Sequence, residues 1–127
     1  IFTASITPAS TAAAMAALEI MQQEPQLQEQ LWALTHYALE GFRNMGCEIG
    51  NTSTPIIPLF IRDNYKTFAI TRDLLEEGIF VNPVVSPAVA PQDTLIRFSL
   101  MATHTKDQVT TALEKIQKVF KKHGILK

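Results

Sequence analysis

Arg97 is the residue whose setting in the sequence points most directly to chemistry. It lies in the middle of residues 95–101, a segment with the length and composition of a β-strand. Alternate side chains of a strand face opposite ways, so Arg97 lies on the face opposite to Ile96 and Phe98. A guanidinium there needs a carboxylate, a phosphate or water. Its fork of donors suits a planar carboxylate; the alternative is an arginine on a solvated sheet face, paired with Asp93.

Cys47 and His104 are the other candidates for chemistry. Cys47 is the single cysteine, so a disulfide within the chain is excluded, and it has no companions spaced as metal ligands. We therefore expect a buried thiol and no metal site. His104 immediately precedes a helix cap. A general base is one interpretation of it, and a structural histidine with satisfied ring nitrogens is the favoured one.

Capping signals and hydrophobic periodicity predict four helices. The first starts at Pro8 behind Thr7 and is broken at residues 24–25, the second stops at Gly46, the third spans residues 65–77, and the fourth follows a capping box at residues 105–108. Four apolar residues of the first helix recur at the spacing of one helix face, which predicts a buried stripe: Ala14, Ala17, Leu18 and Met21. Three residues of the second helix lie partly off its apolar face: Trp32, His36 and Tyr37. They indicate a packing surface for another domain rather than a ligand site.

Four short strands are expected between and after these helices, at residues 47–49, 56–61, 79–81 and 95–101. Pro58 argues for an edge position or a bulge in the second of them. The loop at residues 82–93 contains three prolines, which restrict its backbone and predict an ordered conformation. The resulting fold class is α+β, a small, largely antiparallel sheet covered by helices, in a single domain over residues 1–127.

Composition narrows the classes of function. The chain has 127 residues, 46% hydrophobic content and a formal net charge of −1. This balance is typical of an ordinary globular domain and provides no basic surface for nucleic acid. No apolar run approaches the ~20 residues that cross a bilayer, and no signal peptide opens the chain, so we expect a cytoplasmic protein without a transmembrane segment. Because the chain starts at Ile1, we expect a piece of a longer protein or a processed product.

Two stretches carry a resemblance to a known family. Residues 78–91, GIFVNPVVSPAVAP, and residues 95–105, LIRFSLMATHT, are similar to the C-terminal part of the α-oxoamine synthases. The opening residues 1–8, IFTASITP, resemble the segment that begins the C-terminal domain of that family. The family belongs to the fold-type-I pyridoxal-phosphate enzymes and includes serine palmitoyltransferase, 8-amino-7-oxononanoate synthase and 2-amino-3-ketobutyrate CoA ligase.

The resemblance implies the C-terminal small domain of a homodimeric acyltransferase. Such an enzyme joins an amino acid to an acyl-CoA with loss of carbon dioxide, using pyridoxal 5'-phosphate. It implies that Arg97 binds the carboxylate of the amino acid, and that Thr3 and Ser5 offer hydroxyls to the cofactor phosphate across the dimer interface. A plain strand or cap role for Thr3 and Ser5 is an equal alternative. The cofactor lysine belongs to the preceding large domain, and no lysine here has an apolar setting, so the isolated chain is predicted inactive, with no catalytic residue of its own.

One departure from the family leaves the particular substrates open. Some serine palmitoyltransferases carry an additional arginine in the proline loop, whereas residues 84–93 contain no basic residue. Two other interpretations of the whole chain also remain at this point. It could be a self-standing α+β module for anion binding or dimerisation, or the small domain of a fold-type-I aminotransferase.

Overall fold

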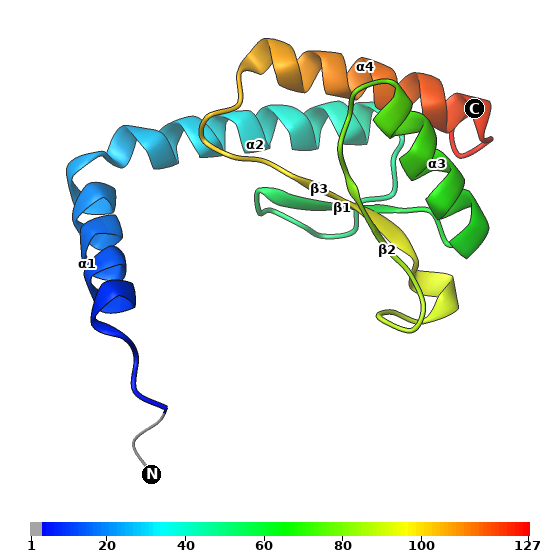
Figure 1. Cartoon of the computed structure of the whole chain (residues 1–127). Helices are drawn as coiled ribbons and strands as arrows, with labels where there is room; N and C mark the ends of the chain where they lie inside the picture. The colour runs from blue at the N-terminus through cyan, green and yellow to red at the C-terminus, as the bar shows by residue number, and fades with distance from the viewer. Residues whose placement is uncertain (1–3) are drawn as a thin grey trace.

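The computed structural model describes residues 4–127, and its architecture confirms the α+β class (Figure 1). Within these residues four helices accompany a three-stranded sheet. In chain order the elements are α1 (Pro8–Gln23), α2 (Pro25–Met45), β1 (Ile56–Phe60), α3 (Asn64–Glu76), β2 (Asn82–Val84), the 3₁₀ turn η1 (Pro91–Asp93), β3 (Leu95–Ser99) and α4 (Lys106–Lys122). Thr3 lies outside the described residues.

The sheet is antiparallel, with strand order β1-β3-β2. β3 is therefore the central strand, and β1 lies at an edge, as Pro58 predicted. In register, Arg97 lies between Pro58 of β1 and Asn82 of β2. A strand centred on this position is hydrogen-bonded on both sides, which holds the backbone of Arg97 firmly.

Three strand predictions need correction. Residues 47–49 form no strand; the Glu48 carbonyl accepts one bond from the Phe60 amide at 2.9 Å, which does not extend into a ladder. Residues 79–81 are not a strand either, because the Ile79 amide closes the end of α3 by donating to Leu74 O at 2.8 Å. Strand pairing begins only at Asn82. β3 ends at Ser99, two residues before the predicted boundary.

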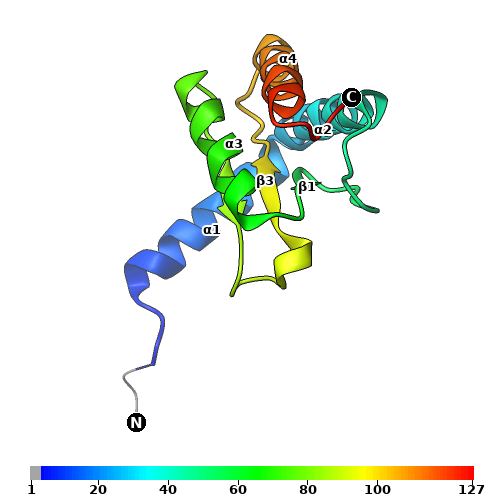
Figure 2. The same ribbon diagram turned by 90° about the vertical axis from the view of Figure 1, so that its right-hand side faces the viewer.

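The core lies between one face of the sheet and the helices α2, α3 and α4, which cover that face (Figure 2). Six apolar residues of α4 are buried, and the ring of Phe42 on α2 meets the ring of Phe98 on β3 edge-on, with 5.1 Å between the ring centroids. The largest completely buried apolar side chains come from five elements, α2, α3, α4, β1 and β3: Phe42, Phe120, Ile57, Leu59, Ile70, Leu74, Ile96 and Ile116.

Local signals in the sequence placed the end of α2 and the start of α4 correctly, whereas α3 begins and ends one residue earlier than predicted. Gly46 ends α2 with φ 81°, a left-handed conformation that glycine adopts without a steric cost. At the start of α4 the Gln108 amide donates to Thr105 Oγ1 at 3.2 Å, and the Thr105 amide donates to Gln108 Oε1 at 2.9 Å. This reciprocal pair is the predicted capping box.

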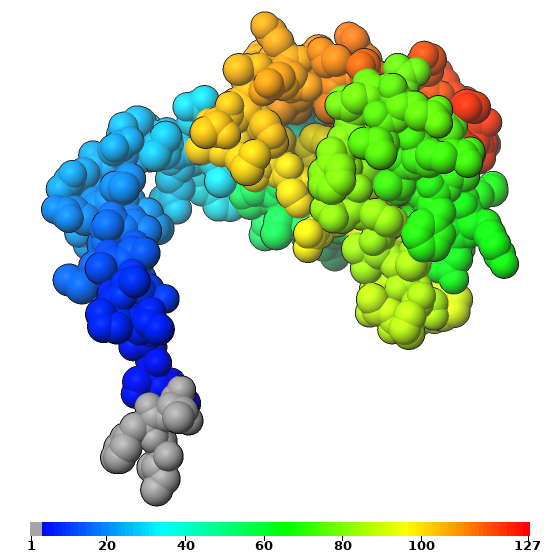
Figure 3. All heavy atoms as spheres, in the orientation of Figure 1, coloured from blue at the N-terminus to red at the C-terminus, as the bar shows by residue number. Residues whose placement is uncertain are grey.

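The predicted buried stripe of α1 is wrong for the chain as described. No residue of α1 is buried, including the four residues of that stripe. The reason is the bend at Glu24, where α1 ends and α2 begins, because it turns α1 away from the rest of the molecule (Figure 1). The space-filling view shows α1 projecting from the body of the protein (Figure 3).

Candidate functional site

Arg97 lies exposed on the face of the sheet that the helices leave open. Its neighbours along β3, Ile96 and Phe98, point into the core instead. Within residues 4–127 its side chain makes no ion pair or hydrogen bond with another residue. The expected partner Asp93 is engaged elsewhere, since its Oδ1 lies 3.5 Å from Nη1 of Arg62. The pairing of Arg97 with Asp93 is therefore absent from residues 4–127, whereas the exposure of Arg97 agrees with the alternative of an arginine on a solvated sheet face.

The surroundings of Arg97 on the open face are largely apolar. Cross-strand partners share a face, so Pro58 lies beside it on β1, and Phe60 pairs with Leu95. Asn82 is the polar neighbour, on β2. A cation on a hydrogen-bonded strand is held in position more firmly than a cation on a mobile surface loop, so it loses less freedom when it binds an anion. The arrangement can bind a carboxylate, and the fork favours two parallel hydrogen bonds.

The loop before β3 is ordered, as its prolines predicted. The Ala88 amide donates to Val85 O at 2.9 Å, and the Asp93 amide donates to Ala90 O at 2.8 Å. The Ser86 amide lies 3.4 Å from its acceptor, Oδ1 of Asn64. This loop therefore has a defined shape where it enters the strand that carries Arg97.

Arg62 is a residue of this region that the sequence analysis missed. Its guanidinium binds both carboxylate oxygens of Glu48, with Nε to Oε2 at 2.8 Å, and also donates to Gln92 O at 2.9 Å. The hydrogen bond from Arg62 holds the pKa of Glu48 below its usual range. These partners lie 14 and 30 positions away in the chain, so no local pattern could have revealed the contact.

His104 and Cys47 have structural settings. His104 Nδ1 accepts a hydrogen bond from the Met101 amide at 3.1 Å, and the His104 amide donates to Met101 O at the same distance. This turn agrees with the structural interpretation of the histidine. Cys47 is buried as expected, and burial raises the pKa of its thiol to about 11, which keeps it protonated and unreactive near neutrality.

Comparisons with known proteins agree with this architecture. The chain matches the family described as aminotransferase class I and II over residues 1–116. It is 57% identical over 126 residues to a serine palmitoyltransferase of Bacteroides ovatus, covering 99% of this chain and 32% of that protein. It is 38% identical over 126 residues to an 8-amino-7-oxononanoate synthase of Petrotoga mobilis, again covering 99% and 32%.

The chain belongs to the α-oxoamine synthase family, within aminotransferase class I and II.

Solved structures show the same relationship. A lysine-to-alanine variant of serine palmitoyltransferase from S. paucimobilis, solved with a bound PLP–myriocin aldimine, superposes with a TM-score of 0.89 at 27% identity, covering 99% of this chain and 32% of that one. The chain thus spans about a third of the length of the α-oxoamine synthases that it matches, and corresponds to their C-terminal portion. Both the family predicted from the motifs and the α+β fold class are confirmed.

The lysines of this α-oxoamine synthase chain do not fit the covalent attachment of pyridoxal phosphate. Such a lysine needs an apolar, desolvated setting. Here six are exposed, and the half-buried Lys115 donates to the Glu77 carbonyl. The seven are Lys66, Lys106, Lys115, Lys118, Lys121, Lys122 and Lys127.

Ser5 is exposed in the segment before α1. Residues 4–127 contain no cluster of potential metal ligands, and no helix among them is long and apolar enough to cross a membrane.

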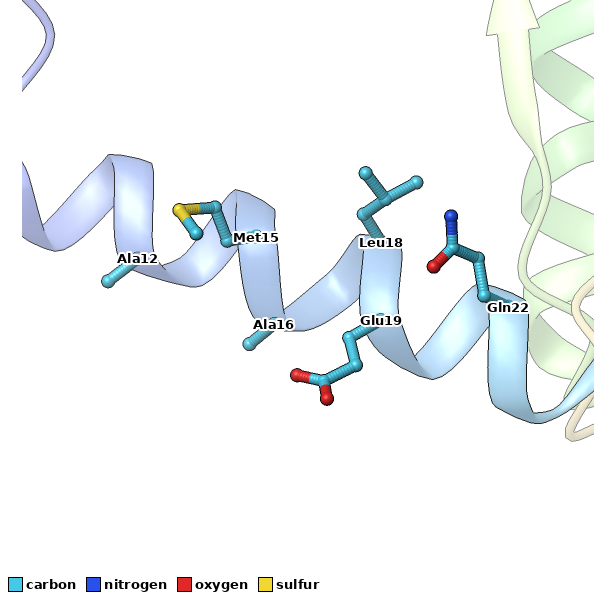
Figure 4. A pocket seen from close by; sticks show the side chains of 6 residues that line it. All are labelled: Ala12, Met15, Ala16, Leu18, Glu19 and Gln22. Carbon is cyan, nitrogen blue, oxygen red and sulfur yellow. The ribbon is translucent and has the colours of Figure 1, made fainter.

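A second surface of interest runs along α1. Large apolar side chains are exposed there: Met15 is 67% exposed and Leu18 56%. An open depression runs along the helix and is lined by six of its residues. In Figure 4, Met15, Leu18 and Gln22 point to one side of the helix, and Ala12, Ala16 and Glu19 point to the other. Among the residues predicted as a packing surface on α2 (Trp32, His36 and Tyr37), Tyr37 packs within the chain. Its hydroxyl forms a hydrogen bond with Thr110 Oγ1 at 2.8 Å, whereas Trp32 remains 40% exposed.

Proposed function

We propose that this chain is the C-terminal domain of a pyridoxal-phosphate-dependent acyltransferase, and that Arg97 binds the carboxylate of its amino-acid substrate. The enzyme would condense an amino acid with an acyl-CoA and release carbon dioxide. The observation that carries the proposal is the position of Arg97, exposed at the centre of the sheet without a partner in residues 4–127. Because relatives at 57% and 56% identity are serine palmitoyltransferases, serine and a long-chain acyl-CoA are the first substrates to test.

The role of Arg97 would be orientation. Two parallel hydrogen bonds to a carboxylate fix both its position and its plane, and the central strand β3 limits the movement of the arginine. When bound, pyridoxal phosphate supplies the electron sink for breaking a bond at the α-carbon, and an aligned substrate presents the correct bond. We propose that the cofactor lysine belongs to polypeptide corresponding to the other two thirds or so of the relatives.

A homodimer is the proposed assembly. In one chain residues 4–7, which precede α1, lie far from β3, as two perpendicular views show (Figures 1 and 2). A site that uses Thr3 and Ser5 for the cofactor phosphate together with Arg97 for the substrate would therefore draw them from two copies.

We also propose a cytoplasmic location and a single domain over residues 1–127. The exposed apolar surface of α1 favours a domain of a larger enzyme over a self-standing module.

Replacement of Arg97 by lysine in the full-length enzyme tests the proposal. Lysine keeps the charge and loses the fork, so we expect kcat/KM for the amino acid to fall about 30- to 1000-fold. The melting temperature should stay within a few degrees, because the exposed side chain leaves no cavity. Arg72→Lys is the matched control, since its side chain is 72% exposed on α3. Wild-type kinetics in Arg97→Lys would exclude Arg97 as the carboxylate ligand.

A further inference from the structure

Arg62 has a backbone conformation that its surroundings must enforce. It has φ 63°, and it is the only residue other than glycine with a positive φ in residues 4–127. L-residues with a side chain adopt this region rarely, because Cβ crowds the neighbouring carbonyl. A strained residue between a strand and a helix persists only where other contacts over-determine it. At Arg62 those contacts come from the side chain and from the backbone.

The side-chain contacts of Arg62 join two segments that are distant in sequence. One arm of the guanidinium binds Glu48, in the segment after α2, through two donors. The other arm reaches the turn η1, where Nη1 donates to Gln92 O at 2.9 Å and lies 3.5 Å from Asp93 Oδ1. The guanidinium carbon also lies 5.1 Å from the centroid of the Phe60 ring, a cation–π distance. All of these contacts hold the guanidinium between β1 and the loop.

Backbone hydrogen bonds also join the end of β1 to the start of β3, and this connection is the junction at Arg62. The amides of Ile61 and Arg62 both donate to the Thr94 carbonyl, each at 3.0 Å. Thr94 is the residue between the turn η1 and β3, and Arg97 follows it by three positions. The junction therefore holds the last residues of the proline loop and the start of the strand that carries the proposed carboxylate ligand.

We propose that Arg62 is a positioning residue that sets the proline loop and the entry of β3, and through them the placement of Arg97 toward substrate. This inference rests on the proposed function. Arg62 does not belong to the hydrophobic core, and its side chain is 46% exposed. Its removal should therefore loosen the loop locally rather than unfold the domain.

Arg62→Gly isolates the contribution of the guanidinium. Glycine adopts φ 63° without strain, so this variant permits the same backbone conformation while losing the side-chain contacts. In the 127-residue chain we expect hydrogen exchange at the Asp93 and Ala88 amides to accelerate roughly 10-fold or more, with exchange at Ile116 of α4 unchanged. Unchanged exchange at Asp93 and Ala88, or an equal acceleration at Ile116, would overturn the inference. Arg72→Ala, on α3, is a control for loss of an exposed arginine, because alanine is compatible with the interior of a helix.

Kinetics of the full-length enzyme test the consequence for the site. We expect Arg62→Gly to raise KM for the amino acid about 10-fold, with KM for the acyl-CoA and kcat changed less than about twofold, as misplacement of a binding group predicts. Arg62→Lys should lie between wild type and Arg62→Gly, because one ammonium cannot reach Glu48 and Gln92 together. A wild-type KM in Arg62→Gly overturns the inference. If the proposed function is wrong, the wild-type enzyme itself forms no condensation product from the amino acid and the acyl-CoA. This outcome differs from failure of the inference about Arg62, in which the wild-type enzyme is active and Arg62→Gly has the same KM.

Discussion

α1 and α4 are helices of nearly equal length, and each is capped by a threonine, yet they bury very different surfaces. α4 has 17 residues and buries six of them, whereas α1 has 16 residues and buries none. α4 carries its apolar residues on one stripe with lysines between them. α1 is apolar on most sides, with Glu19 as its one charged residue. The same capping rule thus produces a packed helix in one case and an unpacked helix in the other.

The difference shows what capping and packing each contribute. A cap decides where a helix starts, whereas burial depends on the neighbours that cover its apolar side chains. A helix that is apolar all round is typical of the interior of a larger protein. The relatives of this chain are about three times as long, so their additional polypeptide is the proposed cover for α1.

Matched leucine truncations should give the largest contrast between the two helices. Leu113 of α4 is 9% exposed and packs against Gly41, whereas Leu18 of α1 is 56% exposed. We expect Leu113→Ala to lower the free energy of unfolding by about 2–5 kcal/mol, through lost burial and a cavity. Leu18→Ala should change it by less than about 0.5 kcal/mol. Urea denaturation of the 127-residue chain measures both, and equal losses would contradict the contrast.

Charges on α1 should change the association of the chain and leave its stability unchanged. The wild-type chain should bind a hydrophobic dye and self-associate, because its exposed apolar side chains have no cover. In a variant with Met15→Lys and Leu18→Lys, both effects should be largely lost. Gln30→Lys, on the exposed surface of α2, is the control for added charge. Sedimentation and dye fluorescence measure the effects, and a dye-free monomer of the wild-type chain would favour a self-standing module.

Acid should act on the end of α4 through Asp73. This carboxylate is 7% exposed on α3, and it binds Lys122 Nζ at 2.8 Å and His123 Nε2 at 2.7 Å. Hydrogen bonds from Lys122 and then His123 lower the pKa of Asp73 to about 2. A lowered pKa stabilises the fold above the ordinary value of 3.8, and the contribution is lost as pH falls toward about 2. Asp73→Asn should weaken the decline in melting temperature over that range.

The control for this acid effect is Glu29→Gln, on the exposed surface of α2. It should leave the pH profile of the melting temperature as in the wild-type chain. If the melting temperature of Asp73→Asn falls in parallel with that of wild type from pH 6 to pH 2, the contacts of Asp73 with Lys122 and His123 contribute nothing to the loss of stability in acid.

Removal of the threonine caps should give the smallest effects, and different ones. Thr105→Ala breaks the capping box of a packed helix, so we expect the free energy of unfolding to fall by about 1 kcal/mol. Thr7→Ala removes the bond from the Ser10 amide, 3.2 Å long, and should fray α1 without changing the melting temperature. Circular dichroism and thermal unfolding separate the two, with the serine variant at each position as the conservative control.

The sequence by itself determined the elements whose signals are local. Caps and breakers placed the helix ends, because Thr7, Gly46 and Thr105 act on backbone groups within four residues. Alternation placed Arg97 opposite the core, because a strand has a period of two wherever it lies. The motifs around the proline loop identified the family, and Pro58 identified an edge strand.

Tertiary structure alone decided what depends on distant residues. Ile79 donates to α3 rather than to a strand, and Asp93 pairs with Arg62 rather than with Arg97. Arg62 itself reaches residues 14 and 30 positions away, and Asp73 reaches one 50 positions away. Such contacts form only after the chain has folded, so periodicity does not encode them. The apolar stripe of α1 follows the same principle: its spacing specifies a face, and only a neighbouring element can bury that face.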